Sequence, residues 1–433
     1  MVELRRTELA VQAERAILVQ VALNGRGGLD EASLEELRSL ARTARVNMVG
    51  EVVQSRPSVA PAFYVGRGKA LELARLCRDK RADVVICDDD LSPTQVKNLE
   101  EQLDTKVIDR SELILDIFAT HARTKQAKVQ VELAQLEYTF PRLKKMWTHL
   151  DRTGGSTGRA GVGVRGPGER QLETDRRLVD KRIHELKKDI EKSAQHRRRM
   201  VQRRNENFTS VALVGYTNAG KSTLMNTLTN AGVSVRDRLF ETLDTRTRLW
   251  MPPDGRRVML SDTVGFIRKL PHHLVASFQA TLEEACEADL LLHVADASSP
   301  TAEAQIDAVA GVLKEIGCLE KPALLVLNKV DALRDSLQLP LLKRKAAHTV
   351  AISALTGQGL DDLARWVQRF FDEQEVELTV ETSVGNGKLF SLLYEKGKVL
   401  ERTYEHEKAR LRVKVPHGLA GVIRSLGAEV WSS

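Results

Sequence analysis

The stretch Gly215-Tyr-Thr-Asn-Ala-Gly-Lys-Ser-Thr223 decides how the whole chain is interpreted. It follows an apolar, strand-like run and precedes a helix-like run, which is the context of a phosphate-binding P-loop. Gly215 and Gly220 let successive backbone N–H groups point at phosphate, while Lys221 supplies charge and Ser222 offers a hydroxyl to Mg²⁺. The stretch therefore predicts a nucleoside triphosphate site, and the alternative is a chance glycine-rich turn.

Two later motifs fit the switch elements of a GTPase. Phe240–Asp244 is a candidate first switch, in which Thr242 could close onto Mg²⁺ and the γ-phosphate. Asp262–Gly265 ends an apolar strand, so Asp262 could hold a Mg²⁺-bound water and the Gly265 N–H could contact the γ-phosphate. Loss of that phosphate would release both loops.

The nucleobase is predicted from the end of another apolar strand. Asn328–Asp331 follows that strand, and the Asp331 carboxylate could accept hydrogen bonds from guanine N1–H and the exocyclic amine. Adenine lacks this donor pair, so the motif favours GTP. Ser353 and Ala354 fit the last guanine loop.

Hydrolysis is expected to be slow without a partner. Phe266 follows Gly265, and its side chain cannot polarise an attacking water as a glutamine would. Asn218 could ligate K⁺ beside the phosphates, or it could simply stabilise the turn.

The candidate site residues fall into three groups. The proposed catalytic residues are Lys221, Thr242, Asp262 and Gly265, and the proposed Mg²⁺ ligands are Ser222 and Thr242. The proposed nucleotide-binding residues are Gly215, Tyr216, Thr217, Asn218, Ala219, Gly220, Lys221, Ser222, Thr223, Phe240, Glu241, Thr242, Leu243, Asp244, Asp262, Thr263, Val264, Gly265, Asn328, Lys329, Val330, Asp331, Ser353 and Ala354.

Composition indicates a multidomain protein of the cytoplasm. The chain has 433 residues, enough for about three domains. Four scattered cysteines, without metal-ligand spacing, are expected to be free thiols. No apolar run is long enough to cross a membrane. Residues 175–204 hold twelve Lys/Arg and five Asp/Glu, a surplus of seven positive charges. This surplus equals the net charge of +7 of the whole chain, so a polyanionic partner is expected to bind there.

The predicted fold class is α/β, with a P-loop GTPase domain between two smaller units. Residues 1–124 alternate strand-like and helix-like segments, 125–206 carry two apolar helical stripes, 207–372 hold the nucleotide motifs, and 373–433 form a small α/β appendage. The second segment predicts a helical hairpin arm. The linker at its tip, 151–170, contains seven glycines and four arginines, which favours contact with folded RNA over a plain linker.

Finer features leave alternatives. A capping box from Ser33 to Glu36 predicts a helix over 33–44, and a second capping box, from Ser92 to Gln95, predicts the start of another helix at Pro93. A further helix is expected over 387–402. Gly66-Arg-Gly-Lys69 is expected to be an ordinary turn rather than a second nucleotide site. Asp88-Asp-Asp90 is expected to be a solvated loop rather than a metal site.

Long runs outside the general GTPase motifs resemble the HflX family of translation-factor-related GTPases. These runs are Val107–Arg110, Leu113–Phe118, Val131–Glu137, Met146–Leu150, Arg165–Gly168, Gln171–Arg177, Gly215–Ser222 and Asp262–Ile267. The resemblance implies a helical arm that reaches the large (50S) ribosomal subunit and its RNA near the catalytic centre. It also implies GTP hydrolysis stimulated by that subunit, splitting of stalled ribosomes under stress, and Mg²⁺ ligation by Ser222 and Thr242. A monomer is expected.

Three departures from the family pattern affect the arm and the first switch. The arm loop is longer over 156–163, Arg170 replaces a typical threonine, and Thr245 stands where proline is common.

The alternative function is a GTP-dependent switch that binds a protein or a non-ribosomal RNA. A small-molecule kinase fits poorly, because Asn328–Asp331 serves guanine selection rather than phosphoacceptor chemistry.

Overall fold

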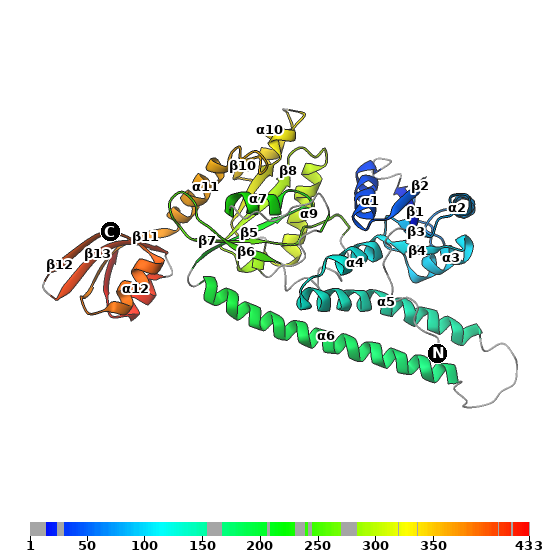
Figure 1. Ribbon diagram of the computed structural model, residues 1–433, viewed down its shortest axis with the longest axis horizontal. Helices are drawn as coiled ribbons and strands as arrows, with labels where there is room; N and C mark the ends of the chain where they lie inside the picture. Colours follow the sequence, from blue (N-terminus) through cyan, green and yellow to red (C-terminus); the bar gives the residue numbers. More distant parts are fainter. Residues whose placement is uncertain are drawn as a thin grey trace.

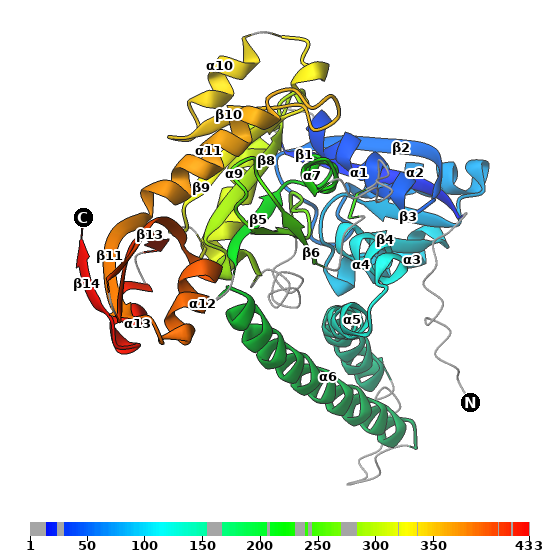
Figure 2. The same ribbon diagram turned by 60° about the vertical axis from the view of Figure 1, so that its left-hand side comes forward.

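The structure is a computed structural model with three β-sheets and a long helical hairpin (Figure 1). It describes residues 14–23, 30–153, 167–205, 208–229, 239–240, 245–269, 284–318, 320–335, 337–405, 407–416 and 419–432. The first two sheets lie beside each other, and the third lies at the far end of the second (Figures 1 and 2). The predicted α/β class is confirmed.

The first sheet has the order β2-β1-β3-β4, and all of its strand pairs are parallel. Its elements are β1 (Arg15–Leu23), α1 (Glu31–Thr43), β2 (Asn47–Arg56), α2 (Arg67–Lys80), β3 (Val84–Cys87), α3 (Pro93–Leu103), β4 (Lys106–Asp109) and α4 (Arg110–His121). Apolar residues of α1 and α4 pack in one core, and those of α2 and α3 pack in another. Both faces are covered, as expected for a parallel sheet.

Helix caps confirm one predicted boundary and correct another. At α3, Ser92 and Gln95 form the predicted capping box. At α1, the cap is Asp30, whose carboxylate accepts a hydrogen bond from the Ser33 N–H at 3.1 Å. The predicted Ser33–Glu36 capping box is therefore wrong, because both side chains lie within the helix, where other contacts engage them.

The predicted hairpin is present as α5 (Lys125–Thr153) and α6 (Pro167–Asn205). It extends away from the first two sheets, with α5 following α4 and α6 leading back to the second sheet (Figures 1 and 2). Leu186 is 1% exposed, and the Arg182 guanidinium pairs with Glu132 across the helices at 2.8 Å. Apolar contact and cross-helix pairing thus hold the two helices together.

The second sheet has the order β10-β9-β8-β5-β7-β6 and is parallel except for the edge strand β6. Its elements are β5 (Thr209–Gly215), α7 (Lys221–Thr229), β6 (Arg246–Trp250), β7 (Val258–Asp262), β8 (Leu290–Asp296), α9 (Ala302–Glu315), β9 (Ala323–Asn328), η1 (Val330–Ala332), α10 (Gln338–Lys343), β10 (Thr349–Ala351) and α11 (Leu360–Glu373). One apolar cluster continues from the first sheet into the second. Within it, the rings of Phe118 and Phe240 meet edge to face with centroids 4.7 Å apart.

The third sheet is antiparallel, with the order β12-β13-β11-β14. Its elements are β11 (Glu375–Ser383), α12 (Gly387–Lys396), β12 (Lys398–Glu405), β13 (Lys408–Pro416), α13 (Leu419–Ser425) and β14 (Glu429–Ser432). The predicted helix over 387–402 is therefore too long, because the chain turns into β12 at Gly397. A Cβ on Gly397 would lie 2.7 Å from Val415 Cγ1, so only glycine allows the strand to pack this closely.

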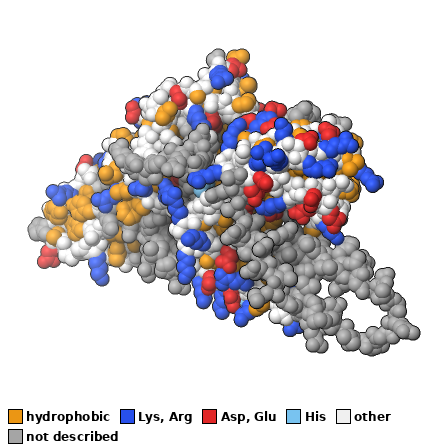
Figure 3. Space-filling view, turned by 45° about the vertical axis from the view of Figure 1, so that its right-hand side comes forward, with side chains coloured by type: hydrophobic (Ala, Val, Ile, Leu, Met, Phe, Trp, Pro, Cys, Tyr) orange, Lys and Arg blue, Asp and Glu red, His pale blue; other side chains and the backbone are white. Residues whose placement is uncertain are grey.

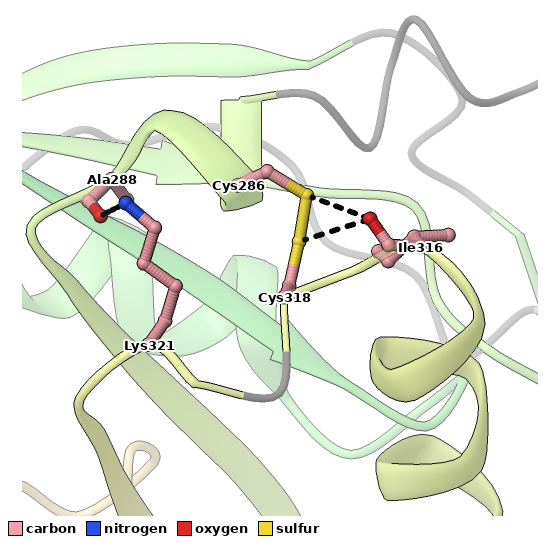
Figure 4. The surroundings of a disulfide bond; sticks show 5 residues. All are labelled: Cys286, Ala288, Ile316, Cys318 and Lys321. Atoms are coloured by element: carbon pink, nitrogen blue, oxygen red, sulfur yellow. Dashed lines mark hydrogen bonds between the residues drawn. A yellow bond between two sulfur atoms is a disulfide. The ribbon is translucent and has the colours of Figure 1, made fainter.

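The prediction that all four cysteines are free thiols is wrong for two of them. Cys286 and Cys318 form a disulfide between the segment before β8 and the loop after α9 (Figure 4). The other two cysteines, Cys77 and Cys87, are free and buried as predicted. The two bonded residues are 32 positions apart in sequence, and folding brings them together at the start of neighbouring strands.

Candidate nucleotide site and its contacts

The predicted P-loop follows β5, a central strand, and leads directly into α7. Gly215 has φ +152°, and a Cβ there would lie 2.1 Å from the Val294 carbonyl oxygen of β8. Gly220 has φ +92°, and a Cβ there would lie 2.2 Å from Asn328 Nδ2. Both positions therefore require glycine, the first because β8 lies so close and the second also because of its backbone conformation.

Lys221 and Ser222 begin α7 as the P-loop pattern requires. The Lys221 ammonium donates to the backbone carbonyls of Gly215 at 3.0 Å and Tyr216 at 2.7 Å. Burial lowers the Lys221 pKa to about 8, against the opposing charge of Asp262. A bound phosphate would place negative charge next to this buried cation and so favour its charged form.

The predicted magnesium ligands fit in part. The Ser222 hydroxyl donates to Asp262 Oδ2 at 2.6 Å, so a hydroxyl and a carboxylate lie side by side at the start of α7. Hard oxygen donors of this kind suit Mg²⁺, which would take the place between them and the phosphates. The other predicted ligand, Thr242, lies outside the described residues, as do Glu241, Leu243 and Asp244.

The predicted guanine motifs meet next to the P-loop. Asn328 ends β9 and is 2% exposed. Its Nδ2 donates to the Ala219 carbonyl and its Oδ1 accepts from the Ala354 N–H, both at 2.9 Å. Asn328 therefore ties the P-loop to the Ser353–Ala354 loop, while Asp331 lies exposed in η1, available to a base.

The second predicted switch lies directly on the P-loop. The Thr217 N–H donates to the Phe266 carbonyl at 2.7 Å, and the Phe266 N–H donates to the Gly215 carbonyl at 3.1 Å. A Cβ on Gly265 would lie 3.0 Å from Lys221 Nζ. Gly265 thus lies against the lysine that is predicted to bind the terminal phosphates, so the geometry brings these candidates together.

Sequence reasoning missed a connection from the P-loop to the first sheet. The Tyr216 hydroxyl donates to Glu36 of α1 at 2.6 Å and accepts from the Arg268 N–H at 2.7 Å. Arg268 also pairs with Asp30 at 3.3 Å. One tyrosine therefore joins the P-loop, the segment after Gly265 and the first sheet.

A buried ionic cluster lies next to this tyrosine. Asp88, at the end of β3, is fully buried and accepts from Arg110 at 2.7 Å and from Lys269 at 2.9 Å. Lys269 also pairs with Asp89 at 2.6 Å, and Arg110 lies 3.1 Å from Glu36. The expectation of a solvated loop at 88–90 is wrong at Asp88, which is buried because the carboxyl ends of these strands face the second sheet, whereas Asp90 is exposed. Three acids directly after a buried strand were the signal available in the sequence.

Family profiles match most of residues 31–329, and known proteins match nearly the whole chain. The matching profiles are "GTP-binding GTPase N-terminal" at 31–119, "GTP-binding GTPase Middle Region" at 121–204 and "50S ribosome-binding GTPase" at 210–329. A GTPase HflX of Lacrimispora saccharolytica is 43% identical over 415 residues, covering 95% of this chain and 96% of that protein. GTPase HflX of Escherichia coli (strain K12) is 41% identical over 406 residues, covering 93% and 94%. A solved GTP-binding protein of Sulfolobus solfataricus in complex with GDP is 25% identical, covers 83% of this chain and 99% of its own, and has a TM-score of 0.44.

Proposed function

Because the chain belongs to the HflX family of GTPases, we propose that it hydrolyses GTP in response to the large ribosomal subunit. In this proposal the hairpin arm contacts ribosomal RNA, and GTP turnover remodels or splits stalled ribosomes in the cytoplasm under stress. None of the helices in the described part of the chain is long and apolar enough to cross a membrane. A role in subunit assembly would use the same contacts.

The arm is the observation that carries the proposal. Residues 176–195 of α6 bear seven Lys/Arg and four Asp/Glu, all exposed. Two of these cations, Arg182 and Lys187, pair with α5 glutamates and so hold the hairpin together. On the face shown in Figure 3, cations and anions are interspersed. A projecting arm with a local surplus of cations suits a polyanion such as RNA.

The nucleotide roles in this proposal combine the site geometry with the sequence motifs. Lys221 would bind the β- and γ-phosphates, and Ser222, with Thr242, would bind Mg²⁺. Asp331 would select guanine. Asn218 has a left-handed backbone with φ 61°, a conformation that asparagine tolerates, and ligation of K⁺ by its side chain would come in addition to that role in the turn.

The deciding experiment measures GTP turnover with and without purified large subunits, in K⁺ and in Na⁺. Replacing the four arginines of 151–170 with serine should reduce stimulation at least tenfold while the affinity for GTP stays within about threefold, because phosphate contacts of the arm are lost and the P-loop is unchanged. These arginines are Arg152, Arg159, Arg165 and Arg170. A matched control replaces four exposed cations on other elements, which are Lys343, Arg344, Lys388 and Arg424.

Three outcomes would contradict the proposal. Turnover that does not change when large subunits are added would exclude stimulation by them. Equal loss of stimulation in the arm variant and the control variant would exclude a specific role of the arm. Absence of GTP-dependent co-sedimentation with ribosomes would favour a regulatory switch for another partner.

A further inference from the structure

The side chain of Thr217 has an unusual environment within the P-loop. Thr217 is 6% exposed, and its Oγ1 has no hydrogen-bond partner among the residues that the structure describes. A buried hydroxyl without a partner destabilises the folded state, whereas valine would fill the same volume without that cost. A group of this kind in a native site calls for an explanation.

Its position points to the terminal phosphate. A Cβ on Gly265 would lie 2.9 Å from both Cα and Cγ2 of Thr217, and 3.0 Å from Lys221 Nζ. Gly265 is the residue whose N–H is predicted to contact the γ-phosphate, and Lys221 is predicted to bind it. Gly265 therefore lies against both Thr217 and Lys221, so Thr217 lies beside the groups that would surround that phosphate.

Neighbouring side chains are already occupied or unsuitable. The Thr263 hydroxyl donates to the Leu213 carbonyl at 2.7 Å, and the Ser222 hydroxyl donates to Asp262. Phe266 has no polar group. Of these residues in the described part of the site, Thr217 alone presents a hydroxyl with a free donor and acceptor.

We propose that Thr217 Oγ1 is a catalytic group of GTP hydrolysis, donating to a γ-phosphoryl oxygen and accepting a hydrogen bond from the attacking water. The water oxygen forms a bond to the γ-phosphorus, and the bond to the β–γ bridging oxygen breaks. GDP leaves with that electron pair, and the water proton passes to the released phosphate. The hydroxyl gains and loses no proton in this step; it positions the water, which Phe266 cannot do.

Thr217→Val tests the proposal because it keeps the side-chain shape and removes the hydroxyl. We expect kcat for GTP to fall at least tenfold, since one hydrogen bond to the transition state is lost. The affinity for GDP should stay within about threefold, because GDP lacks the terminal phosphate. Thr217→Ser should restore most of the turnover. The assay uses GTP hydrolysis without ribosomes, so its outcome is independent of the ribosomal proposal.

Thermal unfolding supplies a second readout that needs no activity. The nucleotide-free T217V protein should melt about 2 °C higher than the unaltered protein, because an unsatisfied polar group has been removed. Thr247→Val is the matched control, since the Thr247 hydroxyl has a partner in Ser261 at 3.0 Å and its loss should lower Tm.

Three results would overturn the proposal. They are turnover of T217V within threefold of the unaltered protein, an equal loss of GDP affinity and turnover, and a Tm lowered as in T247V. If T217V does not fold, T217A and T217S are compared, and equal turnover of these two would refute a role for the hydroxyl.

Discussion

Replacing Arg110 with methionine tests how strongly the buried ionic cluster stabilises the first sheet. The Arg110 side chain is 1% exposed and lies 2.7 Å from Asp88, which is 0% exposed, and 3.1 Å from Glu36, which is 11% exposed. Methionine fills much of the same space but leaves both carboxylates without this cation. Removing one partner of a buried ion pair costs about 3–5 kcal/mol. Because Lys269 remains 2.9 Å from Asp88, we expect the lower end, about 3 kcal/mol.

The effect of Arg110→Met should depend on pH. Burial raises the Glu36 pKa above its ordinary value, and the Arg110 charge opposes that rise. Without Arg110 the pKa rises further. In the native state Glu36 then keeps its proton at pH values where the unfolded chain has already released it, which is above about pH 4.5. The free energy of unfolding therefore falls as the pH rises from about 4.5 to the pKa of Glu36 in the folded protein. The deficit of the variant should therefore shrink as pH is lowered from about 7 to 5.

Hydrogen exchange of the β3 and β4 amides is the appropriate assay, because unfolding of a chain with three sheets need not be two-state. If the free energy of opening falls by about 3 kcal/mol, amide exchange that requires this opening becomes about 100-fold faster. Arg42→Met is the matched control, since Arg42 is 58% exposed and its partner Glu35 is 52% exposed, a pair worth about 1 kcal/mol at most. Exchange that is equally fast in the two variants would refute the reasoning.

Three further changes probe other parts of the chain. Asp331→Asn should weaken GTP binding about 100-fold through the loss of charge-assisted hydrogen bonds, and should favour xanthosine triphosphate, as competition binding would detect. Replacing both Cys286 and Cys318 with serine should destabilise the second sheet by about 3 kcal/mol, measured by hydrogen exchange of the β8 and β9 amides, and only the unaltered protein should respond to a dithiol reductant. Burial raises the Asp116 pKa to about 8, so Asp116→Asn should stabilise the protein by at least about 1 kcal/mol at pH 8, with a gain in thermal unfolding free energy that shrinks toward pH 4.

The sequence predicted elements whose signals are local. The P-loop, the capping box at Ser92 and the hairpin stripes depend on neighbours a few residues apart, and all three are in the structure. Contacts between distant segments were not predictable in this way. Tyr216 and Glu36 are 180 positions apart, and Cys286 and Cys318 are 32 apart, so only the folded chain shows that they meet. The end of α12 was missed for a related reason, since Gly397 is required by a contact with β13 rather than by helix propensity.

The contacts around Gly265 also decide which part can move when a terminal phosphate binds. Gly265 lies against the P-loop lysine, and Lys269, four residues later, pairs with Asp88. If the Lys269 side chain moves away from Asp88, the Asp88 carboxylate still accepts hydrogen bonds from Arg110, from Ser33 at 2.7 Å and from Gln20 at 3.2 Å. The Lys269 side chain is 38% exposed, so water can replace both of its carboxylate partners, Asp88 and Asp89, and the loss of each pair is closer to that of a surface pair, about 1 kcal/mol. Moving the first sheet instead would separate the apolar cluster that it shares with the second, which costs more. Local release of the Lys269 segment is therefore the less costly response to GTP.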